Sequence, residues 1–221
     1  DGLLLWGESF IDAPNDYRLE ARLSKEGGGW ARLELERERY FYDGQFLGNE
    51  GYPAVGTPVP AGFRQDPGDL ETWDQHLLME VGLAFENFPK VWVGYEHGDQ
   101  KGEKSTWVHG IAIDPGNTGE FGAIPQFWEV DYGSDRVYAG LSIDMGAGWN
   151  WDLLPEYEWV RGDQDLTDFF NNSAGNLVNT RFKKYVYDHD MFTFNTVARG
   201  PICTDKLDLE VGYHYHKIWN E

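Results

Sequence analysis

Two pairs of carboxylates are the residues of this chain whose type and spacing come closest to a catalytic arrangement. Glu156 and Glu158 stand two positions apart, as do Asp208 and Glu210. In a strand, such residues share a face at roughly 7 Å, a separation that a pair of glycosidase carboxylates can use. The same spacing is also the ordinary polar row of any acidic sheet. We therefore expect no catalytic residue and no enzymatic activity.

A pair of imidazoles gives a candidate site for metal binding. His214 and His216 share a strand face, and two imidazoles at this spacing can bind a transition metal, although histidines that simply face water produce the same pattern. The one cysteine, Cys203, excludes an internal disulfide and a multi-cysteine metal site. The sequence has no Cys-x-x-Cys-His, no phosphate-binding glycine loop before a helix and no Gly-x-Ser-x-Gly motif. We expect no cofactor.

The elements that position these residues are strands, and the segment from Trp149 to Trp159 shows this best. Successive side chains of a strand point to opposite faces. One face of this segment carries Trp149, Trp151, Leu153, Pro155, Tyr157 and Trp159, and the other carries Asn150, Asp152, Leu154, Glu156 and Glu158. A wall with lipid on one side and water on the other has this composition. The segment therefore predicts a lipid-facing strand.

The same alternation recurs in at least four other segments, around residues 17–36, 77–86, 137–145 and 207–216. In each segment the apolar residues share one parity and the charged or small residues share the other. We interpret the charged parity as the lining of a watered lumen. The predicted lumen-lining residues are Arg18, Glu20, Arg22, Arg32, Glu34, Glu36, Glu80, Glu86, Asp144, Asp152, Glu156, Glu158, Asp208 and Glu210.

Composition limits the classes of function that remain. The chain has 221 residues, a formal net charge of -20, 16% aromatic residues and 27 glycines, which suits strands and turns. Its mean hydropathy is -0.57, and no segment approaches the ~20 apolar residues of a spanning helix, but barrel strands escape such a scan. The acidic balance argues against nucleic acid as a partner. Because the chain begins at Asp1 without a leader, we expect a mature exported protein whose signal peptide has been removed.

The connections and aromatic positions favour a membrane barrel over a soluble sheet. Tyr and Trp cluster near expected strand ends, and short turns alternate with long polar loops near 44–69, 114–122 and 162–184. The stretch 163–170 could form one helical turn. We predict one all-β domain over residues 1–221, an antiparallel up-and-down transmembrane β-barrel in which about 10–12 strands are visible, or part of a larger barrel. Periodicity alone leaves a soluble β-sandwich open as the alternative.

Three segments carry a resemblance to a known class of proteins. They are 85–97 (FENFPKVWVGYEH), 124–131 (IPQFWEVD) leading into 136–141, and 188–194 (DHDMFTF) continuing to Tyr213. These segments resemble strand pairs of Gram-negative outer-membrane, porin-like barrels, including the MtrB/PioB type that sheaths multihaem cytochromes. The resemblance implies a chain located in the cell outer membrane.

Together these observations predict a porin-like channel or conduit with an acidic, cation-favouring lumen, in which Arg18, Arg22 and Arg32 supply local counter-charge. One alternative is a barrel scaffold that sheaths a multihaem cytochrome for electron transfer across the outer membrane. Another is a secreted, soluble β-sandwich that binds or cleaves polysaccharide. The expected partners are outer-membrane lipid and lipopolysaccharide, together with a multihaem cytochrome or further copies of this chain.

Overall fold

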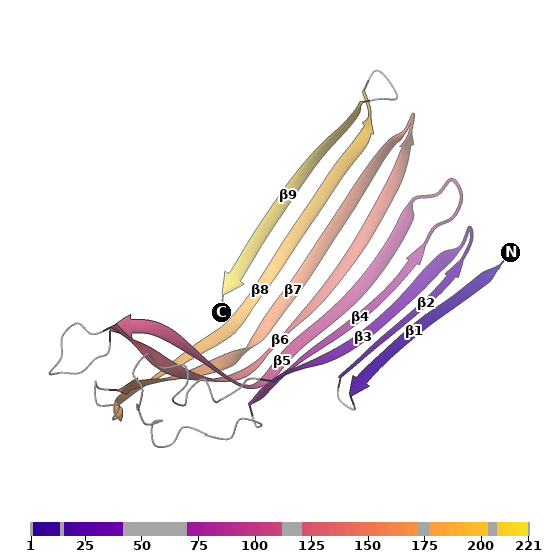
Figure 1. Ribbon diagram of the computed structural model, residues 1–221. Coiled ribbons are helices and arrows are strands. Elements are labelled where there is room, and N and C mark those ends of the chain that lie inside the picture. Colours follow the sequence, from indigo (N-terminus) through magenta and orange to yellow (C-terminus); the bar gives the residue numbers. More distant parts are fainter. Residues whose placement is uncertain are drawn as a thin grey trace.

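Nine long strands lie side by side in one curved sheet in the computed structural model of the chain (Figure 1). The structure describes residues 2–13, 16–41, 70–111, 121–171, 177–202 and 207–220. The strands are β1 (Leu3–Ala13), β2 (Asp16–Lys25), β3 (Gly29–Phe41), β4 (Glu71–Leu83), β5 (Lys90–Ile111), β6 (Phe121–Gly146), β7 (Trp149–Asn171), β8 (Leu177–Pro201) and β9 (Asp208–Asn220).

Every strand pairs antiparallel with the next one along the chain, so the order in the sheet is the order in the sequence. This confirms the predicted all-β, antiparallel, up-and-down architecture. The described residues form nine strands rather than the expected 10–12. Among those residues β1 and β9 are the two edges of an open sheet and do not pair with each other.

Tight turns join the strands at one end of the sheet, which we call the turn end. The turn at 147–148 has positive φ at both Ala147 (53°) and Gly148 (80°), as a two-residue hairpin with the native strand twist requires. The turns at 26–28 and 84–89 lie at the same end. The opposite end, the loop end, holds the connections from β3 to β4, β5 to β6 and β7 to β8. The loops expected at 44–69 and over most of 114–122 lie outside the described residues.

The prediction of a loop at 162–184 is wrong for most of this segment. Residues 162–171 continue β7 and residues 177–184 begin β8, and the stretch 163–170 is strand rather than a helical turn. Ion pairs between the two strands stabilise this pairing: Lys184 Nζ lies 2.5 Å from Asp163 Oδ2 and 3.9 Å from Asp165 Oδ1. Because the contacts are ionic, the sequence lacks the apolar alternation that would have predicted a strand.

The loop-end parts of β5–β8 turn away from the line of the rest of the sheet (Figure 1). Gly102 on β5 and Gly162 on β7 have φ of 131° and 135°, a conformation that glycine adopts readily. A Cβ at Gly162 would collide with the backbone of Asp131 and Tyr132. Beyond the bend, at the loop end, lie the only hydrophobic residues of the described chain that are buried: Leu70, Val130 and Leu166.

Candidate functional site

The register divides the sheet into two faces of opposite chemistry. Residues paired across strands share a face, so Glu20, Glu34 and Leu78 lie in one row, and Ala21, Leu33 and Met79 lie in the next row on the other side. We call the first side, which carries Glu20, Arg32, Glu80, Glu96 and Glu156, the polar face. The other side is the apolar face.

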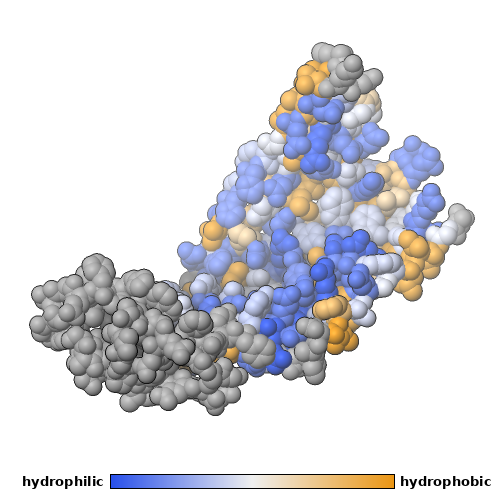
Figure 2. Space-filling model, viewed as in Figure 1, coloured by the Kyte–Doolittle hydropathy of each residue, from blue (hydrophilic) through white to orange (hydrophobic). Residues whose placement is uncertain are grey.

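Exposure on the two faces is the reverse of that in a soluble sheet. Leu33 is 45% exposed, whereas the side chain of its neighbour Glu34 is only 13% exposed. Leu19 is 39% exposed, and the side chain of Glu20 is 11% exposed. Charged side chains therefore crowd together on the polar face while aliphatic side chains project into the surroundings. Figure 2 shows a view dominated by hydrophilic residues, with hydrophobic patches toward the margins.

The aliphatic and aromatic side chains of the apolar face form a continuous band, which we call the apolar belt. On β6 and β7 it spans nine residues, Val137–Met145 and Trp151–Trp159, close to the ~9–11 residues of a tilted membrane-spanning strand. On β4 it runs from Leu77 to the end of the strand at Leu83. Its other members include Leu19, Ala21, Leu23, Ala31, Leu33, Leu35, Val91, Val93, Phe192, Phe194, Ala198, Val211, Tyr213 and Tyr215.

Charged clusters close the apolar belt on its loop-end side. His97 Nδ1 lies 2.8 Å from Asp135 Oδ1. Arg161 contacts Asp188 at 2.9 Å and Asp190 at 2.7 Å, and the Tyr157 hydroxyl donates a 2.6 Å hydrogen bond to Asp190. The apolar face thus carries apolar side chains over a height similar to that of a bilayer core, and charged side chains on the loop-end side of it. Beyond that border the strands β5–β8, 22–26 residues long, continue with polar residues on both faces.

Two arginines of the polar face each connect carboxylates of neighbouring strands. Arg32 pairs with Glu34 and lies 3.7 Å from Glu20, which Arg22 also contacts at 2.5 Å.

Further across the sheet, Arg136 on β6 pairs with Glu96 on β5 and lies 3.6 Å from Glu156 on β7. His76 Nε2 on β4 lies 2.8 Å from the same Glu96 carboxylate. These contacts cross the strands and fix the side chains in place.

Glu80 at the centre of the polar face is held by neutral donors. The Trp30 indole N–H donates to it at 2.9 Å and the Tyr138 hydroxyl donates at 3.0 Å. These two donors are neutral, so they satisfy the oxygens of Glu80 without adding a positive charge. The two rings lie over glycines: a Cβ at Gly82 would fall inside the Trp30 ring, and one at Gly94 would fall inside the Tyr138 ring. Gly82 and Gly94 are therefore needed to seat these two aromatic rings.

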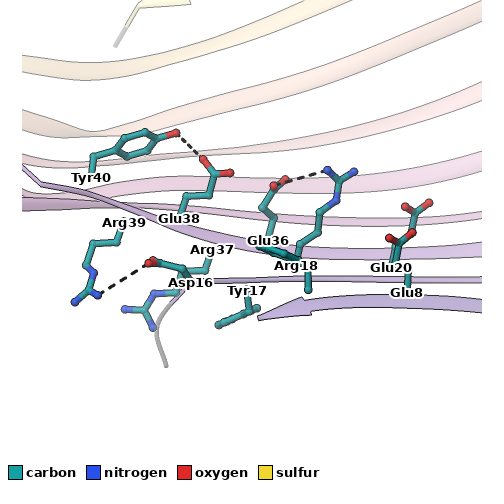
Figure 3. Close-up of a pocket in the computed structure, with 11 residues that line it drawn as sticks. Glu8, Asp16, Tyr17, Arg18, Glu20, Glu36, Arg37, Glu38, Arg39 and Tyr40 are labelled. Atoms are coloured by element: carbon teal, nitrogen blue, oxygen red, sulfur yellow. Dashed lines mark hydrogen bonds and ion pairs between the residues drawn. The ribbon is translucent and has the colours of Figure 1, made fainter. Parts of the chain in front are cut away.

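A hollow of about 610 Å³ opens beside β1–β3 toward the loop end (Figure 3). Its lining includes the carboxylates of Glu8, Glu20, Glu36 and Glu38, and Arg18 lies 4.0 Å from Glu36. Glu8 and Glu20 are directly opposite each other in the register, an arrangement in which like charges repel. The lining also includes Asp16, Arg37 and Arg39, so five carboxylates accompany three arginines, and the net negative charge favours cations within the hollow.

The structure places the predicted lumen-lining residues together with one exception. Arg18, Arg22, Glu36, Asp144, Asp152, Glu158, Asp208 and Glu210 share the polar face with the residues already described. Glu86 does not, because β4 ends at Leu83 and Glu86 lies in the turn between β4 and β5.

The two candidate metal ligands, His214 and His216, also lie on the polar face. Their rings stack with centroids 6.3 Å apart, and His214 Nδ1 lies 2.5 Å from Asn195 Oδ1. No group of three or more His, Cys, Asp or Glu suited to a metal ion occurs in the part of the chain that the structure describes. Metal binding by this pair stays a prediction.

Sequence reasoning missed the cluster of Glu96 and Arg136 as well as strand β1. Both cluster residues continue parities that are visible in the sequence: Trp92, Gly94 and Glu96 on one strand, and Tyr138 and Arg136 on the next. Extending each alternation by one step would have found them.

A second polar cluster lies beyond the bend, outside the apolar belt. Asp168 is fully buried; it accepts hydrogen bonds of 2.7 Å from Gln126 Nε2 and from Arg181 Nε, and Lys183 Nζ lies 3.4 Å away. Burial by itself raises the pKa of Asp168, but the hydrogen bonds from Arg181 and Gln126 and the two positive charges outweigh it. The net effect is a lowered pKa. This carboxylate anchors the loop-end parts of β6, β7 and β8.

No protein-family model, no curated protein and no solved structure matches this chain. Within the described residues no helix is long and apolar enough to cross a membrane. The resemblance to porin-like barrels of the MtrB/PioB type therefore stays a prediction, and the function is inferred from the geometry of the two faces.

Proposed function

We propose that this sheet forms the wall of an outer-membrane β-barrel that acts as a porin-like channel or conduit with an acidic, cation-favouring lumen. The observation that carries the proposal is the reversed exposure of the two faces, with Leu33 more exposed than Glu34. Hydrocarbon outside and water inside stabilise this arrangement, whereas water on both sides would leave the apolar belt exposed to water. The described residues form one sheet, so the second layer of a β-sandwich is not among them.

The charges of the polar face support the cation preference. Glu80 accepts its two side-chain hydrogen bonds from neutral donors, and Glu8 and Glu20 oppose each other beside the hollow. Carboxylates facing a narrow aqueous space between low-dielectric walls attract cations and repel anions.

The first test is whether the chain partitions into detergent micelles and migrates differently on a gel before and after heating, as folded barrels do. The second test is the reversal potential across a planar bilayer under a KCl gradient. We expect cation selectivity in the wild type and a reduced preference in Glu158→Lys, which reverses a charge on the polar face. The matched control is Glu129→Lys, which makes the same change on the opposite face at an exposed position. Anion selectivity, or recovery of folded protein without detergent, would contradict the proposal.

One observation favours the second candidate, a scaffold that sheaths a multihaem cytochrome. The polar-face side of β1 carries Leu4, Trp6 and Phe10, which are 65%, 41% and 63% exposed. Apolar residues in a watered lumen are costly unless something covers them, and a sheathed partner would do so. Haem absorbance that co-purifies with the chain, and is lost in Trp6→Glu, would favour this candidate over an open channel.

A further inference from the structure

An apolar hollow of about 600 Å³ opens over β3 near the turn end of the sheet. It exists because Gly29 and Ala31 are small, while larger side chains stand on both sides: Leu3 and Leu23 toward β1 and β2, and Val81 and Leu83 on β4. A Cβ at Gly29 would collide with the backbone of Gly82, so the close approach of β3 and β4 keeps this position empty of a side chain.

The rim of the hollow consists of exposed apolar side chains, with one charged side chain, Lys25, at its turn-end side. Leu3 is 68% exposed, Val81 54% and Leu83 48%. Lys25 also lines the hollow; it pairs with Gly29 in the register, at the last position of β2 before the turn. The side chain of Lys25 is exposed and meets no carboxylate among the described residues. An ammonium group without a partner, in a chain of net charge -20, thus marks the mouth of an apolar hollow.

We propose that this hollow holds one acyl chain of an anionic phospholipid whose phosphate pairs with Lys25. The inference rests on the proposed function, because the apolar belt must face a bilayer for lipid to reach the hollow. Lys25 lies at the turn-end border of the belt, the level at which headgroups meet water. The hollow takes the chain below that level. The small side chains of β3 thereby form a binding site for one lipid rather than a gap in the wall.

The experiment is native mass spectrometry of the full chain folded in micelles, with either phosphatidylglycerol or phosphatidylcholine added. We expect the wild type to retain one phosphatidylglycerol in preference to phosphatidylcholine. Lys25→Gln should lower that preference about fivefold, the ratio that corresponds to the ~1 kcal/mol of one Lys near anionic headgroups. Ala31→Leu fills the hollow and should abolish retention of both lipids.

The matched control is Ala139→Leu, because Ala139 lies in the same row of the apolar face but outside the hollow. This variant should retain lipid as the wild type does. Equal retention by Ala31→Leu and Ala139→Leu would overturn the acyl-chain seat, and an unchanged headgroup preference in Lys25→Gln would overturn the phosphate contact. Competition by inorganic phosphate alone would identify a free anion instead of a lipid. Failure of the wild type and every variant to fold in micelles would refute the proposed function itself, whereas normal folding in micelles without lipid discrimination would refute only this inference.

Discussion

Replacing Met79 by arginine separates a lipid-facing belt from an exposed but watered surface. Met79 lies on β4 in the middle of the apolar belt and is 44% exposed. An arginine on the lipid face at the bilayer midplane costs about 2–4 kcal/mol. The same substitution on a surface facing water would change the free energy of unfolding by no more than about 0.5 kcal/mol. We therefore expect Met79→Arg to lower that free energy, measured by guanidinium unfolding from phospholipid vesicles with tryptophan fluorescence, by about 2–4 kcal/mol.

Two further arginine variants on the same strand serve as controls. Leu78 is adjacent in sequence but lies on the polar face, opposite Glu34 and Glu96, so Leu78→Arg should cost far less than Met79→Arg. Gln75 shares the apolar face but lies four residues toward the loop end, about 14 Å along the strand. There the cost of arginine should fall to about 0–1 kcal/mol. If Met79→Arg unfolds within 0.5 kcal/mol of the wild type, the apolar belt does not meet hydrocarbon.

Two other predictions concern stability. Because the pKa of Asp168 is lowered, its contribution to the free energy of unfolding is fully present above the unfolded pKa, near 3.8, and is lost as the pH falls through the folded value. Asp168→Asn should remove this acid-sensitive contribution, about 1–3 kcal/mol. If the unfolding free energy of the variant falls with pH as that of the wild type does, the assignment is wrong. Gly140→Ala should lower the free energy of unfolding by about 1–3 kcal/mol, because its Cβ would fall inside the Trp92 ring. Gly212→Ala meets only ordinary contacts and should be nearly neutral. Equal unfolding midpoints for the two variants would show that the ring is not fixed over Gly140.

Period-two alternation made the two faces predictable. Wherever a strand carries apolar side chains on one side and charged side chains on the other, each residue's parity assigns its face, and a one-residue error would exchange the faces entirely. This is why the register confirms a common face for Glu20, Glu34 and Glu80, which are far apart in sequence. Strand β1 escaped the same reasoning because Leu3, Leu4, Leu5 and Trp6 are apolar in both parities.

The loop-end half of β7 and β8 could not be predicted for the opposite reason. Residues 162–184 are mostly polar, their few apolar residues fall in both parities, and they contain Gly, Asn and Asp, which favour turns. Their pairing depends on contacts between the strands, such as Lys184 with Asp163 and Arg181 with Asp168. A single-strand pattern carries no information about such partners, so sequence periodicity follows the apolar belt and stops where the belt stops.

The ionic pairs of the polar face do not neutralise its field, and this decides what the face can do. Arg136 serves the two carboxylates of Glu96 and Glu156, so carboxylates outnumber arginines in that cluster. Glu80 is bound only by the neutral Trp30 and Tyr138 groups in its two side-chain hydrogen bonds. Removing an arginine would therefore increase the negative charge while loosening the carboxylates it positions. We infer that the arginines set where the carboxylates lie, and that the surplus of carboxylates sets which ions the face attracts.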